Sequence, residues 1–277
     1  MTGFFNIDKE EGRSSGYAVN ILKRLTHTPC GHMGTLDPLA SGVLPVGVGN
    51  AARLFDFFLS KQKTYLARFR FGATTSTLDR EGEVVSGGAI PSAEEIEAVL
   101  PQFIGEIAQV PPRYSAVSVN GRRGYALARS GEVFDLPAKT VTVNAFRLIG
   151  QTQEDEFAFE IDCGAGTYIR SLARDLAVAL GTQGYMSALR RTKSGAFTQE
   201  NAVPLAAITR ENAAQYLIPT DSVIDLPSLT VTDERLYHGL SLACDAADGQ
   251  YKLYSAEGFY GLARVCGGVV KTEKKLC

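Results

Sequence analysis

The chain has 277 residues, of which 45% are hydrophobic and 21% are charged, and its formal net charge at pH 7 is -2. This length allows one sizeable core and a small additional module, and no apolar run is long enough for a membrane-spanning helix. The near-neutral charge excludes a uniformly basic nucleic-acid-binding domain, so any nucleic-acid surface must be local.

The N-terminus and the cysteines indicate a reducing, cytoplasmic environment. Residues 1–8 carry neither a basic segment nor an apolar stretch of signal-peptide length. The five cysteines show no Cys-x-x-Cys spacing, which favours free thiols over disulfide bonds or a zinc site. We therefore expect a cytoplasmic protein that does not bind membranes.

The loop at residues 31–45 contains one acid, Asp37, directly before Pro38. A proline ring pushes the preceding residue into an extended conformation, so we expect a stiff segment that presents the carboxylate. An aspartate is ionised at neutral pH and can attack or stabilise an electrophile without an activating base. A solvated acid in a rigid turn is the alternative.

The next segment, Gly47-Val-Gly-Asn-Ala-Ala52, fits the glycine pattern of dinucleotide-binding turns, with Asn50 as a helix cap. However, we expect Pro45 to interrupt the preceding strand, and no acid follows at the distance that a dinucleotide site requires. The segment therefore favours a tight strand-to-helix turn over a nucleotide-cofactor site.

Alternating apolar residues predict a half-buried strand over 64–71. Ser92-Ala-Glu-Glu95 predicts a capping box that opens a short helix, which Pro101 ends. Residues 109–143 are rich in Pro, Gly, Arg and Ser, a composition typical of a long excursion from the core.

A second alternating segment predicts a strand over 157–163. A Gly-rich turn then leads into a helix over 171–180, so Tyr168 and Arg170 lie at a strand-to-helix junction. After Leu226 the pattern changes to short strands separated by turns, and we place a domain boundary there.

Short clusters of Lys and Arg are candidates for phosphate contacts, although each alone is more typical of a solvated surface. They are Lys61/Lys63, Arg68/Arg70, Arg122/Arg123 and Arg190/Arg191/Lys193.

Six segments carry a family pattern in one order along the chain. They are the loop at 31–45, Lys63-Thr64-Tyr65, Thr75-x-Thr77-x-Asp79-x-x-Gly82, Gln109-Val-Pro-Pro-x-Tyr-Ser-Ala116, Gly166-Thr-Tyr-Ile-Arg170 and Leu189-Arg-Arg-Thr-x-Ser-Gly195. Together they closely resemble the bacterial tRNA pseudouridine-55 synthases, in the TruB family of pseudouridine synthases. Several separated motifs in register are far more specific than any single short pattern.

The resemblance implies an α+β catalytic domain over residues 1–226, with a mixed, largely antiparallel central sheet, flanking helices and an RNA-gripping insertion near 109–143. It implies a small, PUA-like RNA-binding β-barrel over 227–277. The implied reaction converts uridine 55 in the T-arm of tRNA to pseudouridine by base flipping and an aspartate-dependent rearrangement of the glycosidic bond. It implies no cofactor, no metal and no obligate protein partner, and we expect a monomer.

The resemblance implies catalytic roles for Asp37, Tyr65 and Arg170. Asp37 matches the catalytic acid, and the sequence leaves open whether it attacks the ribose or the pyrimidine ring. Tyr65 matches a residue that contacts the flipped base, with a role in moving the C5 proton; a core tyrosine is the alternative. Arg170 is interpreted as a partner that orients Asp37, or as an ion pair that ties the helix start to a loop.

Five further residues are implied to bind substrate. His32 matches a residue associated with RNA distortion, and Tyr168 and Leu189 match pocket positions. Asp79 matches a polar position beside the pocket, with a turn aspartate as the alternative. Lys9 is retained from a family motif, Lys-Pro-x-Gly, whose proline is replaced here by Glu10. This departure puts the geometry or RNA contact of that loop in question.

Two other functions remain open at this point. One is the same reaction on another RNA. The other is a non-catalytic RNA-binding or RNA-folding module, which Asp37 would distinguish because such a module does not need the acid.

Overall fold

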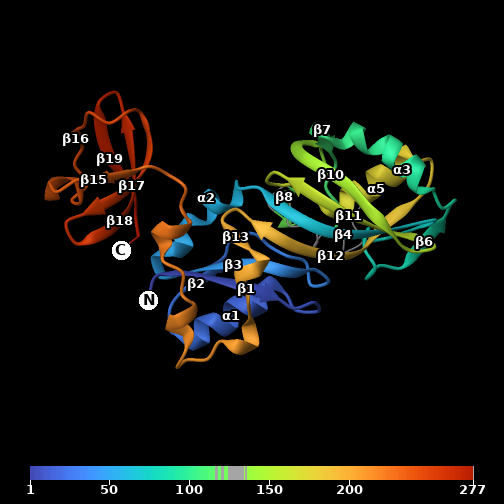
Figure 1. The fold of residues 1–277 in the computed structure, drawn as a ribbon, viewed down its shortest axis with the longest axis horizontal. Coiled ribbons are helices and arrows are strands. Elements are labelled where there is room, and N and C mark those ends of the chain that lie inside the picture. Colours follow the sequence, from blue (N-terminus) through green and yellow to red (C-terminus); the bar gives the residue numbers. More distant parts are fainter. Residues whose placement is uncertain (116–117, 120–121, 124–133, 135, 277) are drawn as a thin grey trace. The chain divides into compact units, whose positions relative to one another are not determined.

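The computed structural model describes residues 1–115, 118–119, 122–123, 134 and 136–276. They form two compact units (Figure 1). Unit 1 comprises residues 1–37, 43–59 and 196–277, and unit 2 comprises residues 38–42 and 60–195. The predicted division into 1–226 and 227–277 stays a prediction.

A mixed, largely antiparallel sheet dominates unit 2. Its strands follow the order β12-β4-β11-β10-β7, and each of these neighbouring pairs is antiparallel. The first residues of β3 (Ser41–Val48) pair with β12 in parallel. The strands are β4 (Lys63–Phe71), β7 (Gly105–Gln109), β10 (Lys139–Gln153), β11 (Glu156–Cys163) and β12 (Gly184–Ser194). The expected sheet class is confirmed.

Alternation along β4 separates the two faces of this sheet. Tyr65, Ala67 and Phe69 are buried, and the Phe69 and Phe159 rings lie 4.8 Å apart between centroids. Helices α3 (Ala93–Val99) and α5 (Ile169–Ala179) pack against the strands. The sheet thus has one face in the core and one face that carries polar side chains.

Both helices predicted for unit 2 are present, with small shifts in where they begin or end. The capping box at Ser92 and Glu95 is present, and α3 ends at Val99 before a 3₁₀ turn, η2 (Leu100–Phe103), that contains Pro101. Helix α5 begins at Ile169, two residues earlier than expected. The remaining strands are β5 (Ala73–Thr75), β6 (Val84–Gly87), β8 (Ser118–Val119) and β9 (Arg122–Arg123). Much of the predicted insertion near 109–143 lies outside the described residues.

Unit 1 places β1 (Gly3–Lys9) between β14 (Val203–Pro204) and β3, while β2 (Cys30–His32) pairs with β3 in antiparallel register. Pro45 lies inside β3, so the expected interruption of this strand was wrong. The Pro45 carbonyl still accepts a hydrogen bond from the Met33 N–H at 2.8 Å, and the strand therefore continues although proline has no N–H to donate.

Strand β3 leads directly into a 3₁₀ helix, η1 (Gly49–Leu54), as the strand-to-helix interpretation predicts. The helix begins at Gly49, one residue before the expected cap Asn50. Gly49 has φ +62°, a conformation that favours glycine. The other helices of unit 1 are α1 (Ser15–Thr26) and α2 (Phe55–Leu59), with short 3₁₀ turns η3 (Gln199–Asn201), η4 (Leu205–Ala207), η5 (Ala213–Tyr216), η6 (Thr220–Val223) and η7 (Glu234–Leu236).

The C-terminal segment forms a curled five-stranded sheet in the order β15-β17-β18-β19-β16. The strands are β15 (Ser228–Thr230), β16 (Leu242–Ala243), β17 (Gly249–Ser255), β18 (Gly258–Cys266) and β19 (Val269–Lys275), and β13 (Phe197–Thr198) precedes them. Leu253 and Val265 belong to a core of this sheet, whereas Leu262 and Leu276 join the cluster of buried residues that contains Phe4. The sheet is therefore packed into unit 1.

Among the residues that the structure describes, no helix has both the length and the apolar character needed to cross a lipid bilayer.

Candidate active site

Asp37 lies half-buried in the irregular loop between β2 and β3. The Ser15 hydroxyl holds the preceding residue: it accepts a hydrogen bond from the Leu36 N–H at 2.8 Å and donates one to the Leu36 carbonyl at 2.9 Å. Ser15 is the first residue of α1, and its neighbour Ser14 caps this helix by accepting from the Tyr17 N–H. The loop backbone before Asp37 is thus fastened to a capped helix.

Gly42 shows why the loop motif requires glycine near its end. Its φ is +98°, and a Cβ at this position would lie 2.3 Å from the Arg191 carbonyl oxygen. Gly42 pairs with Arg191 in the parallel ladder between β3 and β12. The parallel pairing with Arg191 therefore leaves no room for a side chain at Gly42.

Asp79 and Arg170 form a buried ion pair in unit 2. The Arg170 Nη1 atom lies 3.4 Å from Asp79 Oδ2, and the two side chains are only 7% and 5% exposed. Arg170 also donates to the carbonyls of Thr77 and Tyr114, at 3.2 and 2.9 Å. The Thr77 hydroxyl donates to Asp79 Oδ1 at 2.6 Å. Arg170 thus ties the start of α5 to the turn that contains Asp79, and its pairing with Asp37 stays a prediction.

Gln109 fixes the start of α5. Its side-chain amide donates to the Tyr168 carbonyl at 3.2 Å and accepts from the Tyr168 N–H at 2.8 Å. The Ser171 hydroxyl and Arg174 both donate to the Val110 carbonyl. These contacts hold the segment after β7 against the end of the helix that carries Arg170.

Tyr65 and Leu189 lie on adjacent strands with little exposed surface, 8% and 9% respectively. In the antiparallel register, Tyr65 pairs with Arg191 and Ala67 pairs with Leu189. Side chains two residues apart share one face of a strand, so Tyr65 and Leu189 are diagonal neighbours on the same face. Both predicted substrate contacts thus belong to one patch of the sheet.

Two buried cations, Lys63 and Arg191, lie beside this patch. The sequence analysis named them only as members of basic clusters that are candidates for phosphate contacts. Lys63 is 6% exposed and Arg191 is 1% exposed. Burial, together with the charge of Arg191, lowers the pKa of Lys63 to about 8. The Lys63 ammonium donates to the Lys61 carbonyl at 2.6 Å. Hydrophobic periodicity conceals such residues, because a strand pattern gives no reason to bury a charge.

Lys9 and His32 belong to unit 1. Lys9 is 2% exposed, and its ammonium donates to the carbonyls of Glu10 and Arg13 at 2.9 and 2.6 Å. It therefore braces the loop in which Glu10 replaces the family's proline. His32 is half-buried at the end of β2 and pairs with Val46. RNA binding by either residue stays a prediction.

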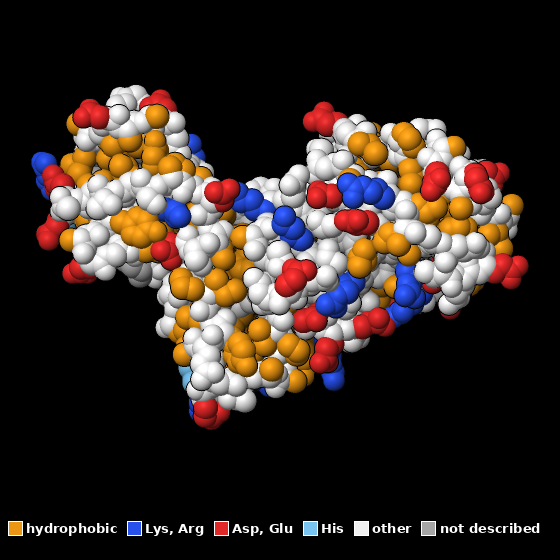
Figure 2. Space-filling view, in the orientation of Figure 1, with side chains coloured by type: hydrophobic (Ala, Val, Ile, Leu, Met, Phe, Trp, Pro, Cys, Tyr) orange, Lys and Arg blue, Asp and Glu red, His pale blue; other side chains and the backbone are white. Residues whose placement is uncertain are grey.

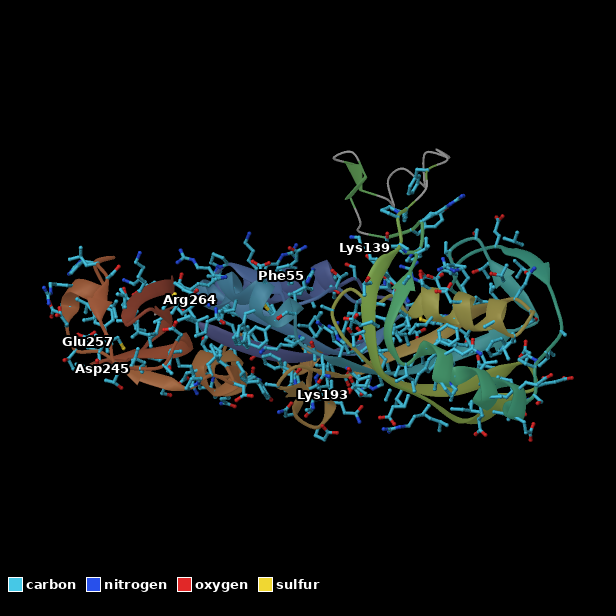
Figure 3. All side chains as sticks on the ribbon, turned by 90° about the horizontal axis from the view of Figure 1, so that it is seen from above. Phe55, Lys139, Lys193, Asp245, Glu257 and Arg264 are labelled. Carbon is cyan, nitrogen blue, oxygen red and sulfur yellow. The ribbon has the colours of Figure 1, made fainter. Side chains whose placement is uncertain are left out.

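The basic clusters predicted from the sequence differ in their exposure. Lys63 and Arg191 are buried, whereas Lys193 is exposed (Figure 3). Arg70 lies 3.3 Å from Asp155 Oδ2, and Arg68 lies 3.7 Å from Glu156 Oε2. Figure 2 shows Lys and Arg side chains interspersed with Asp and Glu on the face that it draws.

The structure thus brings Asp79 and Arg170 together and links Tyr168 to them through Gln109 and α5. It puts Tyr65 and Leu189 on neighbouring strands of the same unit. Tyr65 supplies a phenol and Asp37 supplies a carboxylate, which can act in proton transfer and nucleophilic catalysis. Arg170 supplies a guanidinium, which can hold an anion in position. The sequence interpretation did not identify Gln109 as a positioning residue, although its motif begins there. The described residues contain no group of three or more potential metal ligands.

Two family models match most of the chain. Residues 23–169 match the TruB family pseudouridylate synthase N-terminal domain, and residues 170–224 match the tRNA pseudouridylate synthase B C-terminal domain.

Curated relatives and solved structures agree with these matches. A tRNA pseudouridine synthase B of Caulobacter sp. (strain K31) is 41% identical over 241 residues, which cover 84% of this chain and 78% of the relative. The protein of the same name from Bradyrhizobium diazoefficiens is 40% identical over 261 residues, covering 89% and 76%. A chain in the crystal structure of a Cbf5-Nop10-Gar1 complex superposes with a TM-score of 0.75 at 26% identity, covering 99% of this chain and 85% of that chain.

Proposed function

The chain belongs to the TruB family of pseudouridylate synthases and isomerises uridine to pseudouridine in tRNA, and from this premise we propose its target nucleotide and the roles of its residues. The target is uridine 55 in the T-arm. This proposal rests on the resemblance of the loop at 31–45 and of five further motifs to the position-55 enzymes.

Asp37 is the catalytic acid of the proposed mechanism. Its carboxylate forms a bond to the ribose or the pyrimidine ring, the bond from sugar to base nitrogen breaks, and the base rotates. The sugar bond then re-forms through C5 of the base, the bond to Asp37 breaks, and the base loses the C5 proton and gains a proton at N1. The observation that carries this role is the fixed loop: Ser15 holds Leu36 by two hydrogen bonds directly before the acid. A nucleophile held in position avoids part of the entropic cost of reaching its target.

Tyr65 contacts the flipped uracil, and its hydroxyl takes part in moving the C5 proton. Flipping costs a few kcal/mol, which stacking against an aromatic ring offsets by roughly 1–3 kcal/mol. Arg170 orients the catalytic acid, and Asp79 in turn fixes Arg170 through the buried ion pair. Tyr168 and Leu189 line the uracil pocket, and His32 and Lys9 support the distorted RNA.

The remaining proposals concern the RNA-binding parts of the chain, its oligomeric state and its location in the cell. The curled sheet from Ser228 onward acts as a PUA-like, RNA-binding barrel, and the segment near 109–143 grips the RNA. The protein acts as a monomer in the cytoplasm without a cofactor or an obligate protein partner.

The experiment that tests the proposal maps pseudouridine at single-nucleotide resolution in unmodified tRNA after incubation with the wild-type chain and with Asp37→Asn. We expect one modified site, at position 55, with the wild type and none with the variant. Asparagine keeps the size of the side chain and removes its charge, so RNA binding should persist. Modification elsewhere, or a variant rate within tenfold of wild type, equivalent to only about 1.4 kcal/mol of barrier, would contradict the proposal.

A further inference from the structure

The Ser115 hydroxyl is buried and has no hydrogen-bond partner among the described residues. The residue is 5% exposed, and none of the residues that the structure describes supplies a partner for its Oγ atom. Its N–H donates to the Arg113 carbonyl at 3.0 Å, and the preceding Pro111 and Pro112 are buried. The hydroxyl therefore belongs to a hydrogen-bonded turn.

The position of Ser115 connects it to the buried ion pair. The carbonyl of the adjacent Tyr114 accepts a hydrogen bond from Arg170 Nη2 at 2.9 Å, and Arg170 is the residue paired with Asp79. Ser115 is thus one peptide away from a group that Arg170 holds directly. The same segment is fastened to the start of α5 through Val110.

An unpartnered buried hydroxyl is unfavourable for the fold. Leaving a buried donor or acceptor unsatisfied costs about 1–3 kcal/mol. Alanine has nearly the same shape without the polar atom and would avoid this cost. Buried polar groups of native proteins nearly always have a partner, which can be supplied by a ligand where the free protein lacks one.

We propose that Ser115 contacts the substrate: when tRNA is bound, its hydroxyl forms a hydrogen bond with the RNA beside the Arg170–Asp79 pair. This inference rests on the proposed function, because it takes the RNA as the ligand of this site. Rotation about χ1 moves the hydroxyl between staggered positions while the backbone stays in place, so the turn itself need not rearrange. A hydroxyl both donates and accepts, and it therefore suits a carbonyl, a phosphate oxygen or a ribose hydroxyl.

Thr220 provides a matched control. Its hydroxyl is also buried, at 5% exposure of the residue, and it too lacks a partner among the described residues. However, Thr220 lies in η6 of unit 1, and no motif of the predicted site includes it. Thr220→Val removes the same kind of group at a place where no substrate contact is proposed.

The experiment measures single-turnover rate, KM and thermal unfolding for the wild type, Ser115→Ala, Ser115→Cys and Thr220→Val with unmodified tRNA. We expect Ser115→Ala to lower kcat/KM at least tenfold while Tm stays equal or rises. Cysteine, a weak hydrogen-bond donor of similar size, should give a smaller loss. Thr220→Val should keep kcat/KM within twofold and leave Tm equal or higher.

Two results separate this inference from its premise. If the wild type modifies position 55 and Ser115→Ala does so equally well, the substrate contact is refuted and the proposed function stands. If the wild type leaves tRNA unmodified, the proposed function and the contact that depends on it both fail. A lower Tm for Ser115→Ala would also overturn the inference, because it would mean that the hydroxyl stabilises the free fold.

Discussion

The Ser15 hydroxyl bonds both backbone groups of Leu36, accepting from its N–H at 2.8 Å and donating to its carbonyl at 2.9 Å. Ser15→Ala leaves both of these backbone groups without their partner directly before Asp37. We expect kcat to fall about tenfold with little change in KM, because a displaced acid weakens the transition state more than substrate binding. Single-turnover kinetics with saturating tRNA checks this.

Ser14→Ala is the control for that variant. It removes the cap of α1, which costs about 1 kcal/mol, but leaves the bonds to Leu36. A drop in Tm without a drop in kcat is expected. Equal kinetic losses in the two variants would show that helix stability, not loop position, controls the rate.

Removing the carboxylate of the Asp79–Arg170 pair should cost much more unfolding free energy than removing one from a more exposed pair in the same unit. Asp79→Asn removes a carboxylate that holds the buried Arg170 guanidinium, and breaking a buried pair typically costs 3–5 kcal/mol. Asp155→Asn removes one of two carboxylates beside Arg70, whose Nη2 atom also lies 3.7 Å from Glu156 Oε1. At this partly exposed pair the change should cost under about 1 kcal/mol. Urea unfolding of both variants measures the difference, and similar losses would contradict it. We also expect Asp79→Asn to lower kcat through Arg170.

Two substitutions of Tyr65 separate the contribution of its ring from that of its hydroxyl. Tyr65→Phe keeps the stacking surface and should lose turnover if the hydroxyl helps to move the C5 proton. Tyr65→Leu loses both and should also bind RNA more weakly, since stacking of a base contributes about 1–3 kcal/mol. Turnover and tRNA affinity are measured for both variants. A near-normal rate for Tyr65→Phe would rule out the proton-transfer role.

The lowered pKa of Lys63 predicts that the stability of the fold depends on pH. Burial and Arg191 lower its pKa to about 8 from an ordinary value of 10.5, so the unfolded chain binds the proton more tightly than the folded chain. The resulting penalty is complete below about pH 8 and disappears as the pH rises toward 10.5. Lys63→Met removes the charge and should gain stability relative to wild type most at pH 7, and progressively less from pH 8 to 10.

Chemical denaturation across this pH range measures the difference between the two proteins, which cancels the titration of other groups. Lys193→Met, at an exposed site, should show no such trend. A constant difference between Lys63→Met and wild type would mean that the ammonium is not perturbed.

Removal of residues 228–277 should destabilise unit 1. Leu262 and Leu276 share a buried cluster with Phe4, and Lys274 donates to the Arg53 carbonyl at 2.7 Å. Loss of two buried leucines typically costs several kcal/mol. The Tm of the truncated chain tests this expectation. An unchanged Tm would support an independent domain boundary near Leu226.

The sequence predicted local structure well wherever one segment contains its own signal. The alternation of β4 and the capping box of α3 are examples, because each depends on residues within a few positions of one another. The predicted interruption of the strand at Pro45 was wrong. Proline is expected at strand edges because it has no N–H to donate, but here the strand continues without that hydrogen bond.

The sequence did not show which residues far apart in the chain contact one another. The motifs did not indicate that Asp79 pairs with Arg170, and the pairing of Arg170 with Asp37 stays a prediction. The burial of Lys63 and Arg191 was likewise hidden, because alternation identifies the inward positions of a strand but not the charges that other strands bring to them. The family motifs identified candidate site residues, and the structure was needed to show which residues they contact.

Unit 1 has a consequence for synthesis on the ribosome, because its parts are far apart in the chain. Strand β1 pairs in parallel with β14, at Val203–Pro204, so Ile7 and Asp8 at its end meet these partners only after residue 204 has been made. Most of unit 2 comes from the continuous stretch 60–195 and can begin folding earlier. Since domains tend to fold as their residues emerge, we expect nascent chains to protect the middle of the protein from proteases before its N-terminus.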